Sequence, residues 1–457
     1  MATRLSLALL GAAALFAAAP VAAQLLSAGL GGAVGGLGNA VGGLGGGLGN
    51  GLGGTVGGLP NSVLGAASLE QAAQRRALVG GAFDRIDHLA SSVADTADSL
   101  VDLRRLRLSL LVEAHRTELD RDGAGNPVRR DRLVAVDPDP ASLAAATAEG
   151  FRILSDERED QLGLRLVSLG VPARMSPRKA LDTLRRAAPS LNADFDHIYE
   201  PAGGALTPSM ARLASGTAPR GTRIGMIDGG VASHPSMARA SIEQKGFAGP
   251  ASATGHGTAV ASLLVGDQGL FKGAARGAGL FVGDVYGGNP ASGSALAIVR
   301  ALGWAASKNP QLINISLVGP ANRAIERAIG ALRGRGIMIV AAVGNDGPAA
   351  PPQYPASYPG VVAVTGVDTK GKALIEAGRA THIDFAAPGA DLAAALPGSG
   401  YTRIRGTSFA APLVAARLAA NGSLDRLAGE ARPGKGKVGR GIVCGECRID
   451  PRSVGAK

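Results

Sequence analysis

The sequence is poor in aromatic residues and in cysteine, and it holds no long block of lysine and arginine. Of its 457 residues only 3% are aromatic and two are cysteines, while the net charge is +11. The basic residues are mostly scattered arginines without interleaved aromatics, which is typical of a solvated surface and argues against a nucleic-acid partner. The hydrophobic share of 46% is ample for a buried core. The length predicts two or three structural units.

The two cysteines, Cys444 and Cys447, argue against two classes of function. Zinc needs more ligands than this pair supplies, and no thioredoxin-like strand and helix surround it, so a redox function is not expected. In an exported chain the same spacing permits a small local disulfide. The basic C-terminal run that contains them, residues 426–457, is interpreted as a solvated tail.

Charged residues are also missing between Arg4 and Glu70. Residues 1–23 resemble a signal peptide, with one arginine before a short apolar stretch and small residues before Gln24. The stretch is short for a membrane span, so we expect export and no transmembrane anchor after signal cleavage. Residues 24–67 are almost entirely Gly, Leu, Val, Ala and Asn, which predicts a flexible tether. The final location, whether periplasm, cell surface or medium, stays open.

Two further segments precede the part of the chain that holds the chemistry. Residues 68–130 are predicted to be a helical region, because apolar residues recur at helical spacing within 83–118. These residues are Ile86, Leu89, Val93, Ala97, Leu100 and Leu103. Residues 131–200 alternate short strands and helices in the order β-α-β-β-α-β, which predicts a small α+β domain of the ferredoxin-like type. A linker rich in Pro and Gly follows at 201–214.

Residues 215–425 have the pattern of a parallel α/β domain, a sheet flanked by helices on both faces. Apolar runs of the kind that form buried strands are separated by helical patterns. The predicted strands are 223–228, 280–286, 311–317, 336–343 and 361–367. In open sheets of this class, ligands and chemistry gather at the carboxyl ends of the strands.

Three short motifs lie at the edges of these predicted elements. RIGMIDGGV places Asp228 at the carboxyl end of a strand, and GHGTAVASLLVG places His256 near the start of a helix. GTSFAAP places Ser408 at the start of another helix. A serine hydroxyl is a poor nucleophile until an imidazole takes its proton, and that imidazole needs a carboxylate to hold its tautomer. Each residue alone has a structural explanation, but the three together indicate a catalytic triad.

Over roughly residues 215–425 the chain resembles the subtilisin-like serine proteases, or subtilases. GTSFAAP matches the family's Gly-Thr-Ser-x-Ala-x-Pro motif, GHGTAVAS matches its His-Gly-Thr motif, and the order Asp, His, Ser is that of subtilisin. The resemblance implies that Asn345, in AAVGNDGP, is an oxyanion-hole donor together with the backbone N–H of Ser408. The alternative for Asn345 is a turn residue. One departure is Gly229, where the family usually has serine or threonine beside the aspartate, so a local hydrogen bond is lost and activity could be reduced.

The resemblance also assigns substrate-binding residues on two walls of the first specificity pocket. They are Ser316, Leu317 and Val318, which pair with the substrate backbone, and Ala341, Ala342 and Val343 on the opposite wall. Because Val318 stands where the family usually has glycine, we expect a preference for modest side chains before the cleaved bond. Family members often bind calcium, but the sequence offers no site that we would assign, and no cofactor is expected.

These observations favour an exported serine endopeptidase that acts on proteins or peptides. The resemblance implies that it is made as a zymogen, with residues 131–200 as a propeptide that inhibits the enzyme, and that it cleaves itself between about Tyr199 and Ala211. The first alternative is a catalytically weak or silent homologue that serves as a surface binding module. The second is a surface or structural protein built around the glycine-rich segment.

Overall fold

The computed structural model of the protein describes residues 97–202, 204–205 and 217–456. The predicted signal peptide, the tether and the start of the predicted helical region lie outside these residues, as does most of the linker at 201–214. Of the helix predicted within 83–118, the described part is α5, Ala97–Ala114. Within α5, Leu100 is buried, as expected for the apolar stripe.

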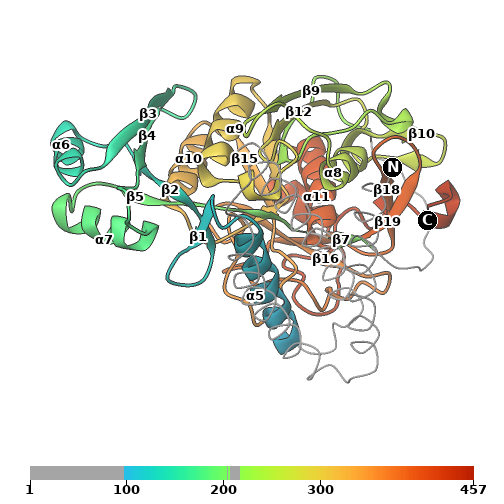
Figure 1. The fold of residues 1–457 in the computed structure, drawn as a ribbon. Helices are drawn as coiled ribbons and strands as arrows, with labels where there is room; N and C mark the ends of the chain where they lie inside the picture. Colours follow the sequence, from blue (N-terminus) through green and yellow to red (C-terminus); the bar gives the residue numbers. More distant parts are fainter. Residues whose placement is uncertain (1–96, 203, 206–216, 457) are drawn as a thin grey trace, which may run out of the picture. The chain divides into compact units, whose positions relative to one another are not determined.

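A seven-stranded parallel sheet lies at the centre of the larger domain (Figure 1). Its order is β17-β16-β15-β13-β8-β12-β9, and every neighbouring pair is parallel. The strands are β8 Arg223–Asp228, β9 Ser241–Gly246, β12 Gly279–Asp284, β13 Leu312–Ile315, β15 Met338–Ala342, β16 Val362–Val367 and β17 Phe385–Pro388. All five predicted strands are present. The other two, β9 and β17, were not predicted, because β9 is a largely exposed polar edge strand and β17 has only four residues.

Helices cover both faces of this sheet, as predicted for the α/β class. The helices are α8 Gly255–Val265, α9 Ala295–Ser307, α10 Arg323–Gly334, α11 Thr407–Asn421 and the short α12 Leu424–Glu430. Side chains alternate along the strands, so Ile224 and Met226 of β8 pack with α8 and α11, whereas Ile227 packs with α9 and α10. Burial on both faces explains why these strands read as continuous apolar runs.

A smaller α+β domain precedes the large one in the chain. Its elements are β1 Leu119–Arg121, β2 Pro127–Val136, α6 Pro140–Ala148, β3 Arg152–Glu159, β4 Leu164–Gly170, α7 Pro177–Ala187 and β5 Ala193–His197. From β2 to β5 this is the predicted β-α-β-β-α-β order. The predicted helical region 68–130 is wrong at its end, because β1 and the first residues of β2 lie within it. The strands pair antiparallel in the order β5-β2-β4-β3, and β1 also pairs with β2. That is the strand order of a ferredoxin-like sheet.

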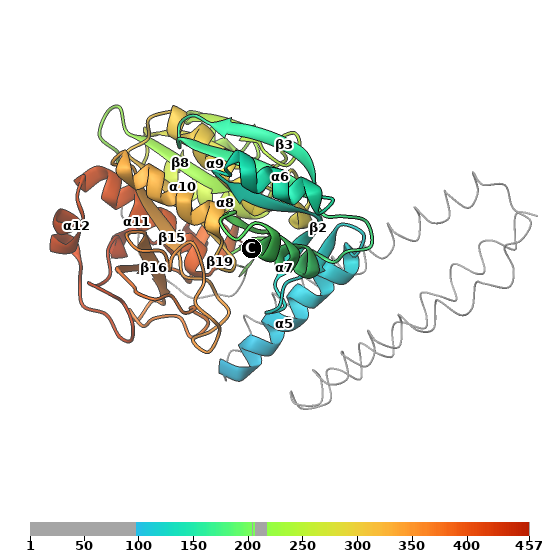
Figure 2. The same cartoon turned by 90° about the vertical axis from the view of Figure 1, so that its left-hand side faces the viewer.

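The small sheet is covered on both faces. Leu133 and Ala135 of β2 pack with α6 and α7, which lie on the side of the sheet turned toward the viewer in Figure 2. The alternate residues Val134 and Val136 pack instead with the cluster formed by α9 and α10 of the large domain. The small domain therefore buries one face of its sheet against the outer surface of the large domain.

Short strands complete the structure around the sheet. They are β6 Glu200–Pro201, β7 Gly204–Ala205, β10 Asp267–Gln268, β11 Phe271–Lys272, β14 Leu317–Val318, β18 Leu392–Ala395 and β19 Tyr401–Arg405. Four single turns of 3-10 helix are η1 Pro235–Met237, η2 Pro290–Ser292, η3 Gly445–Cys447 and η4 Pro451–Val454. Among the described residues, no helix is both long and apolar enough to cross a membrane.

The expectation of a solvated C-terminal tail is wrong. Val443 and Ile449 are buried in the core cluster that contains α11, and so are Cys444 and Cys447, which form a disulfide. Arg448 is buried as well and donates hydrogen bonds to the carbonyl oxygens of residues 367, 368 and 390. Burial lowers the pKa of this guanidinium. The segment packs because its few apolar side chains cover the open side of the large domain's core, while its charges point outward or find carbonyl partners.

Candidate active site

The three residues of the predicted triad meet at the carboxyl edge of the central sheet. Asp228 is the last residue of β8, and His256 and Ser408 are each the second residue of a helix, α8 and α11. His256 Nδ1 lies 2.9 Å from Asp228 Oδ1, and His256 Nε2 lies 2.9 Å from Ser408 Oγ. Asp228 and His256 are 28 residues apart in the sequence, and His256 and Ser408 are 152 residues apart, yet the three side chains form one hydrogen-bonded chain.

The chemistry of the three groups decides where the protons lie. A carboxylate only accepts hydrogen bonds, so Nδ1 of His256 carries the hydrogen and Nε2 is left to accept from the hydroxyl of Ser408. Asp228 and Ser408 are fully buried, while the imidazole is 11% exposed and can face a substrate. This arrangement can remove the proton of Ser408 as its oxygen attacks an electrophile.

The environment of Asp228 differs from the family pattern at Gly229. The backbone N–H of Gly229 donates to Asp228 Oδ1 at 2.7 Å, but Oδ2 has no donor among the described residues. A β-carbon at Gly229 would lie 2.3 Å from Oγ1 of Thr254 and 2.6 Å from its Cγ2. Thr254 is the N-cap of α8 and accepts from the N–H of Gly257 at 2.9 Å. The space of the usual serine or threonine side chain is therefore filled by a threonine from the neighbouring segment.

Asn345 and the backbone of Ser408 point at one oxygen atom. Asn345 Nδ2 donates to the carbonyl oxygen of Ala202, and the N–H of Ser408 donates to the same oxygen at 3.1 Å. The orientation of the Asn345 amide is fixed from its other side, where Oδ1 accepts from the N–H of Thr407 at 2.9 Å. Two donors converging on a carbonyl oxygen beside a nucleophile form the geometry that stabilises a tetrahedral oxyanion.

The chain around Ala202 lies across this site as an extended strand. Glu200–Pro201 (β6) pairs antiparallel with Leu317–Val318 (β14), and the N–H of Ala202 donates to the carbonyl oxygen of Ser316 at 2.9 Å. Beyond Ala202, β7 pairs antiparallel with β19. The chain's own segment thus pairs with β14 before Ala202 and with β19 after it.

The predicted substrate-binding residues divide into two groups. Ser316, Leu317 and Val318 contact the bound segment through their backbones, and Ser316 Oγ also donates to the carbonyl oxygen of Ser408 at 2.9 Å. Ala341, Ala342 and Val343 are fully buried at the end of β15. Their assignment to the opposite wall of the pocket stays a prediction.

Two functional elements were not predicted. Thr407 holds the loop before Asn345, because its hydroxyl accepts from the N–H of Gly344 at 3.0 Å and donates to the carbonyl of Gly344 at 3.1 Å. Its place inside the GTSFAAP motif was the only available signal. The second element, β19, carries no recognised motif, although it pairs with β7 of the bound segment as a strand.

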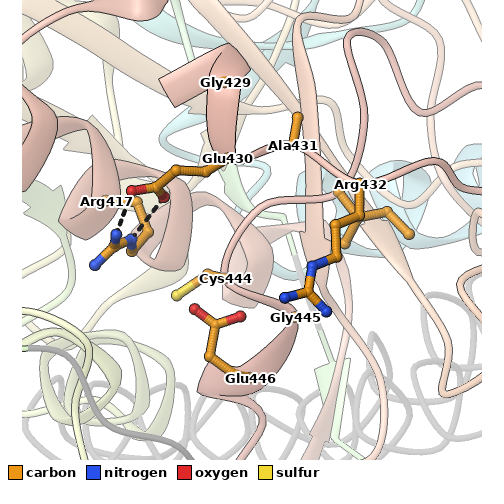
Figure 3. Close-up of a pocket in the computed structure, with 9 residues that line it drawn as sticks. Arg417, Gly429, Glu430, Ala431, Arg432, Cys444, Gly445 and Glu446 are labelled. Atoms are coloured by element: carbon orange, nitrogen blue, oxygen red, sulfur yellow. Dashed lines mark hydrogen bonds and ion pairs between the residues drawn. The ribbon is translucent and has the colours of Figure 1, made fainter. Parts of the chain in front are cut away.

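A separate cavity of about 450 Å³ lies away from these residues (Figure 3). It is bounded by Arg417 and Glu430, which form an ion pair, and by residues of the C-terminal segment such as Arg432 and Cys444. Arg417 follows Ser408 by nine residues in α11, so a rise of about 1.5 Å per residue separates them by roughly 13 Å along the helix. The cavity therefore has no part in the chemistry of the triad. Within the described residues no group of three or more His, Cys, Asp or Glu side chains is arranged to hold a metal ion.

Comparisons with known proteins identify the family. The sequence model of the subtilase family matches residues 219–424. Subtilisin Savinase of Lederbergia lenta is 32% identical over 205 residues, which are 44% of this chain and 75% of that protein. Subtilisin E of Bacillus subtilis (strain 168) is 28% identical over 294 residues, 61% of this chain and 77% of that protein. Other curated relatives, such as an alkaline protease, are matched over about half of their length (53%).

The fold is also similar to a solved structure. Fervidolysin from Fervidobacterium pennivorans, described as a keratinolytic enzyme related to subtilisin, superposes with a TM-score of 0.59 at 19% identity. The match covers 72% of this chain and 61% of that one. It therefore reaches beyond the 206 residues that the family model matches, 219–424.

Proposed function

The chain belongs to the subtilase family of serine peptidases, and from this premise we propose that it is an exported endopeptidase made as a precursor that cleaves itself. The contacts of Ala202 carry the proposal. Its carbonyl oxygen accepts from both Asn345 and Ser408, and the chain on either side pairs with β14 and β19. These are the contacts expected of a substrate backbone bound for cleavage, which supports the proposal.

In the proposed mechanism Ser408 Oγ attacks the carbonyl carbon of the scissile bond while His256 Nε2 takes the hydroxyl proton. Asp228 holds the imidazole and stabilises the imidazolium that forms. The resulting oxyanion is bound by Asn345 Nδ2 and the N–H of Ser408, whose position at the N-terminus of α11 adds the favourable helix dipole. His256 then gives its proton to the leaving amine, and a water molecule, deprotonated by His256, hydrolyses the acyl-enzyme.

We assign the processing site to the carboxyl side of Ala202, within the window expected from the sequence. In this position Ala202 is P1, the residue whose carbonyl is attacked, and a small P1 residue agrees with the narrow entrance expected from Val318. Tyr199 is then P4. Its ring is fully buried beside Gly319, where a β-carbon would lie 2.6 Å from it, and its hydroxyl donates to the carbonyl of Pro320. The proposed preference is therefore a small residue at P1 and an aromatic residue at P4.

The small domain is proposed to act as the propeptide, a folding aid and temporary inhibitor. Its strand β5 supplies two carboxylates to helix N-termini of the large domain. Asp196 Oδ1 accepts from the N–H of Leu296 in α9 at 2.9 Å, and Asp194 Oδ2 accepts from the N–H of Arg323 in α10 at 3.1 Å. Both carboxylates accept from N–H groups that have no partner within their helix. Their negative charges also interact favourably with the positive ends of the helix dipoles. After cleavage these contacts would keep the tail ending at Ala202 in the cleft.

The alternative, a silent homologue, draws its support from Gly229 and from the missing donor at Asp228 Oδ2. A fluorophosphonate probe, which labels only an activated serine, separates the two. We expect the processed native chain to be labelled and to hydrolyse a peptide with the sequence of residues 197–205, and Ser408→Ala to do neither. A correctly processed native chain without labelling or hydrolysis would leave the silent homologue as the better account.

A further inference from the structure

A carboxylate next to the oxyanion asparagine is covered by helix α5. Asp346 follows Asn345 directly, and only 4% of it is exposed. Arg104 Nε lies 3.0 Å from its Oδ2, and Arg107 Nη2 lies 2.9 Å from its Oδ1. These two arginines stand one turn apart on α5, and they are the cations that the structure pairs with Asp346. Among the described residues, the cations paired with this carboxylate therefore both come from the N-terminal part of the chain.

The same helix shields the loop beside Asp346. A β-carbon at Gly347 would lie 2.9 Å from the side chain of Leu100, so α5 packs directly on this loop. Figure 1 shows α5 beside β1, the first strand of the small domain. Because α5 precedes Ala202 in the chain, cleavage after Ala202 separates it from the peptidase. Once the N-terminal part leaves, the Asp346 carboxylate loses both of these arginine partners.

The position of Glu200 shows which substrate residue then faces Asp346. Glu200 is two residues before Ala202, so it occupies P3 in the proposed register. Arg107 binds its carboxylate through Nε and Nη2, both at 3.2 Å, and the same Nη2 contacts Asp346 at 2.9 Å. A single nitrogen thus lies between the P3 carboxylate and Asp346. An arginine or lysine at P3 extends further than glutamate and would bring its own cation to the place that Arg107 now fills.

We propose that Asp346 is a specificity-determining residue of the mature enzyme, which selects an arginine or lysine side chain at P3 of its protein substrates. This inference rests on the proposed function. A cation at P3 forms an ion pair with Asp346, whereas glutamate at P3 meets a like charge. The propeptide escapes this repulsion because Arg107 travels with it. After α5 is displaced, its Glu200 tail is a poor competitor for the cleft.

The test uses the full chain, matured by its own processing and separated from its N-terminal part. Three peptides spanning residues 197–205 carry Arg, Gln or Glu at the position of Glu200, and kcat/KM is measured for each with native enzyme, Asp346→Asn and Asp425→Asn. Asp425 is a fully exposed acid on α12 and serves as the matched control. We expect the native enzyme and Asp425→Asn to prefer Arg over Glu by roughly tenfold or more at low salt, with Gln between them.

In Asp346→Asn the ratio of kcat/KM for the Arg peptide to that for the Glu peptide should fall close to one. In the native enzyme 1 M salt should reduce this ratio, because charges are screened over about 3 Å at that concentration. The native ratio and its salt dependence need no variant, so a folding defect in Asp346→Asn does not remove the test. Cleavage of all three peptides at equal rates, or an unchanged ratio in Asp346→Asn, overturns the inference and leaves the proposed function standing. An enzyme that neither labels with fluorophosphonate nor cleaves any peptide overturns both.

Discussion

Arg107 of α5 ties the N-terminal part of the chain to the peptidase. It binds Asp346 of the peptidase and Glu200 of the bound tail, and its side chain is only 17% exposed. Arg107→Ala removes one of the cations that pair with the Asp346 carboxylate, whose side chain is 5% exposed. The Glu200 carboxylate then loses its partner as well and stays near Asp346. We therefore expect the cleaved N-terminal part to bind the peptidase more weakly and to inhibit it for a shorter time.

The binding free energy lost in Arg107→Ala lies between two limits. Exposed ion pairs contribute about 0–1 kcal/mol, and breaking a fully buried pair costs about 3–5 kcal/mol. This pair is partly buried and Arg104 still contacts Asp346, so we expect about 1–3 kcal/mol, or roughly a 5- to 150-fold weaker complex. The assay follows peptide hydrolysis by the full-length chain after processing, in which the lag before full activity reports release of the N-terminal part.

The matched control is Arg105→Ala on the same helix. Arg105 is 74% exposed and pairs with Asp102 of its own helix, so its loss should leave the lag unchanged. A lag in Arg107→Ala equal to that of Arg105→Ala would show that the ion pair across the interface does not hold the N-terminal part. The reasoning from burial and charge would then be refuted.

Three further outcomes are expected. Asn345→Ala removes one of the two donors to the oxyanion and should lower kcat by a factor on the order of 10²–10³, the range measured for one such donor in a subtilisin. KM should change little, and an equally large change in KM would contradict the role. Gly229→Ser should lower activity and the melting temperature, because its β-carbon would clash with Thr254. The double variant with Thr254→Gly should recover part of the loss. Additive effects of the two substitutions would contradict the contact. Burial raises the pKa of Asp122, but hydrogen bonds from His197 and Asn126 outweigh this and lower it from 3.8 to about 2, so its stabilising contribution is present above about pH 4 and is lost as the pH falls toward 2. Asp122→Asn should therefore destabilise the precursor at pH 7 but not at pH 2 in thermal unfolding, and an equal effect at both values would be inconsistent with the ionised pair.

The sequence predicts the parts of the site that are encoded locally. Asp228, His256 and Ser408 each lie in a short motif at the end of an apolar strand or the start of a helix, so the class of fold and the motif together bring them to one edge. Asn345 is predictable for the same reason, since it lies in the turn three residues after the end of the buried strand β15.

Other features depend on contacts between distant segments and carry no local signal. The threonine that fills the space at Gly229 comes from 25 residues further along the chain, and the arginines that cover Asp346 come from a helix more than 200 residues before it. The C-terminal segment was misjudged because its glycines and charges dominate the composition, while the residues that bury it, such as Val443 and Ile449, are few.

Self-cleavage requires the bond after Ala202 to lie in the active site of the precursor. The most direct test is to express the full chain, isolate the peptidase and determine its N-terminal residue by mass spectrometry, with Ser408→Ala expressed in parallel. We predict a native chain that begins immediately after Ala202 and a Ser408→Ala chain that stays uncut at this bond. A native start at another residue, or the same cut in Ser408→Ala, would contradict self-cleavage at Ala202.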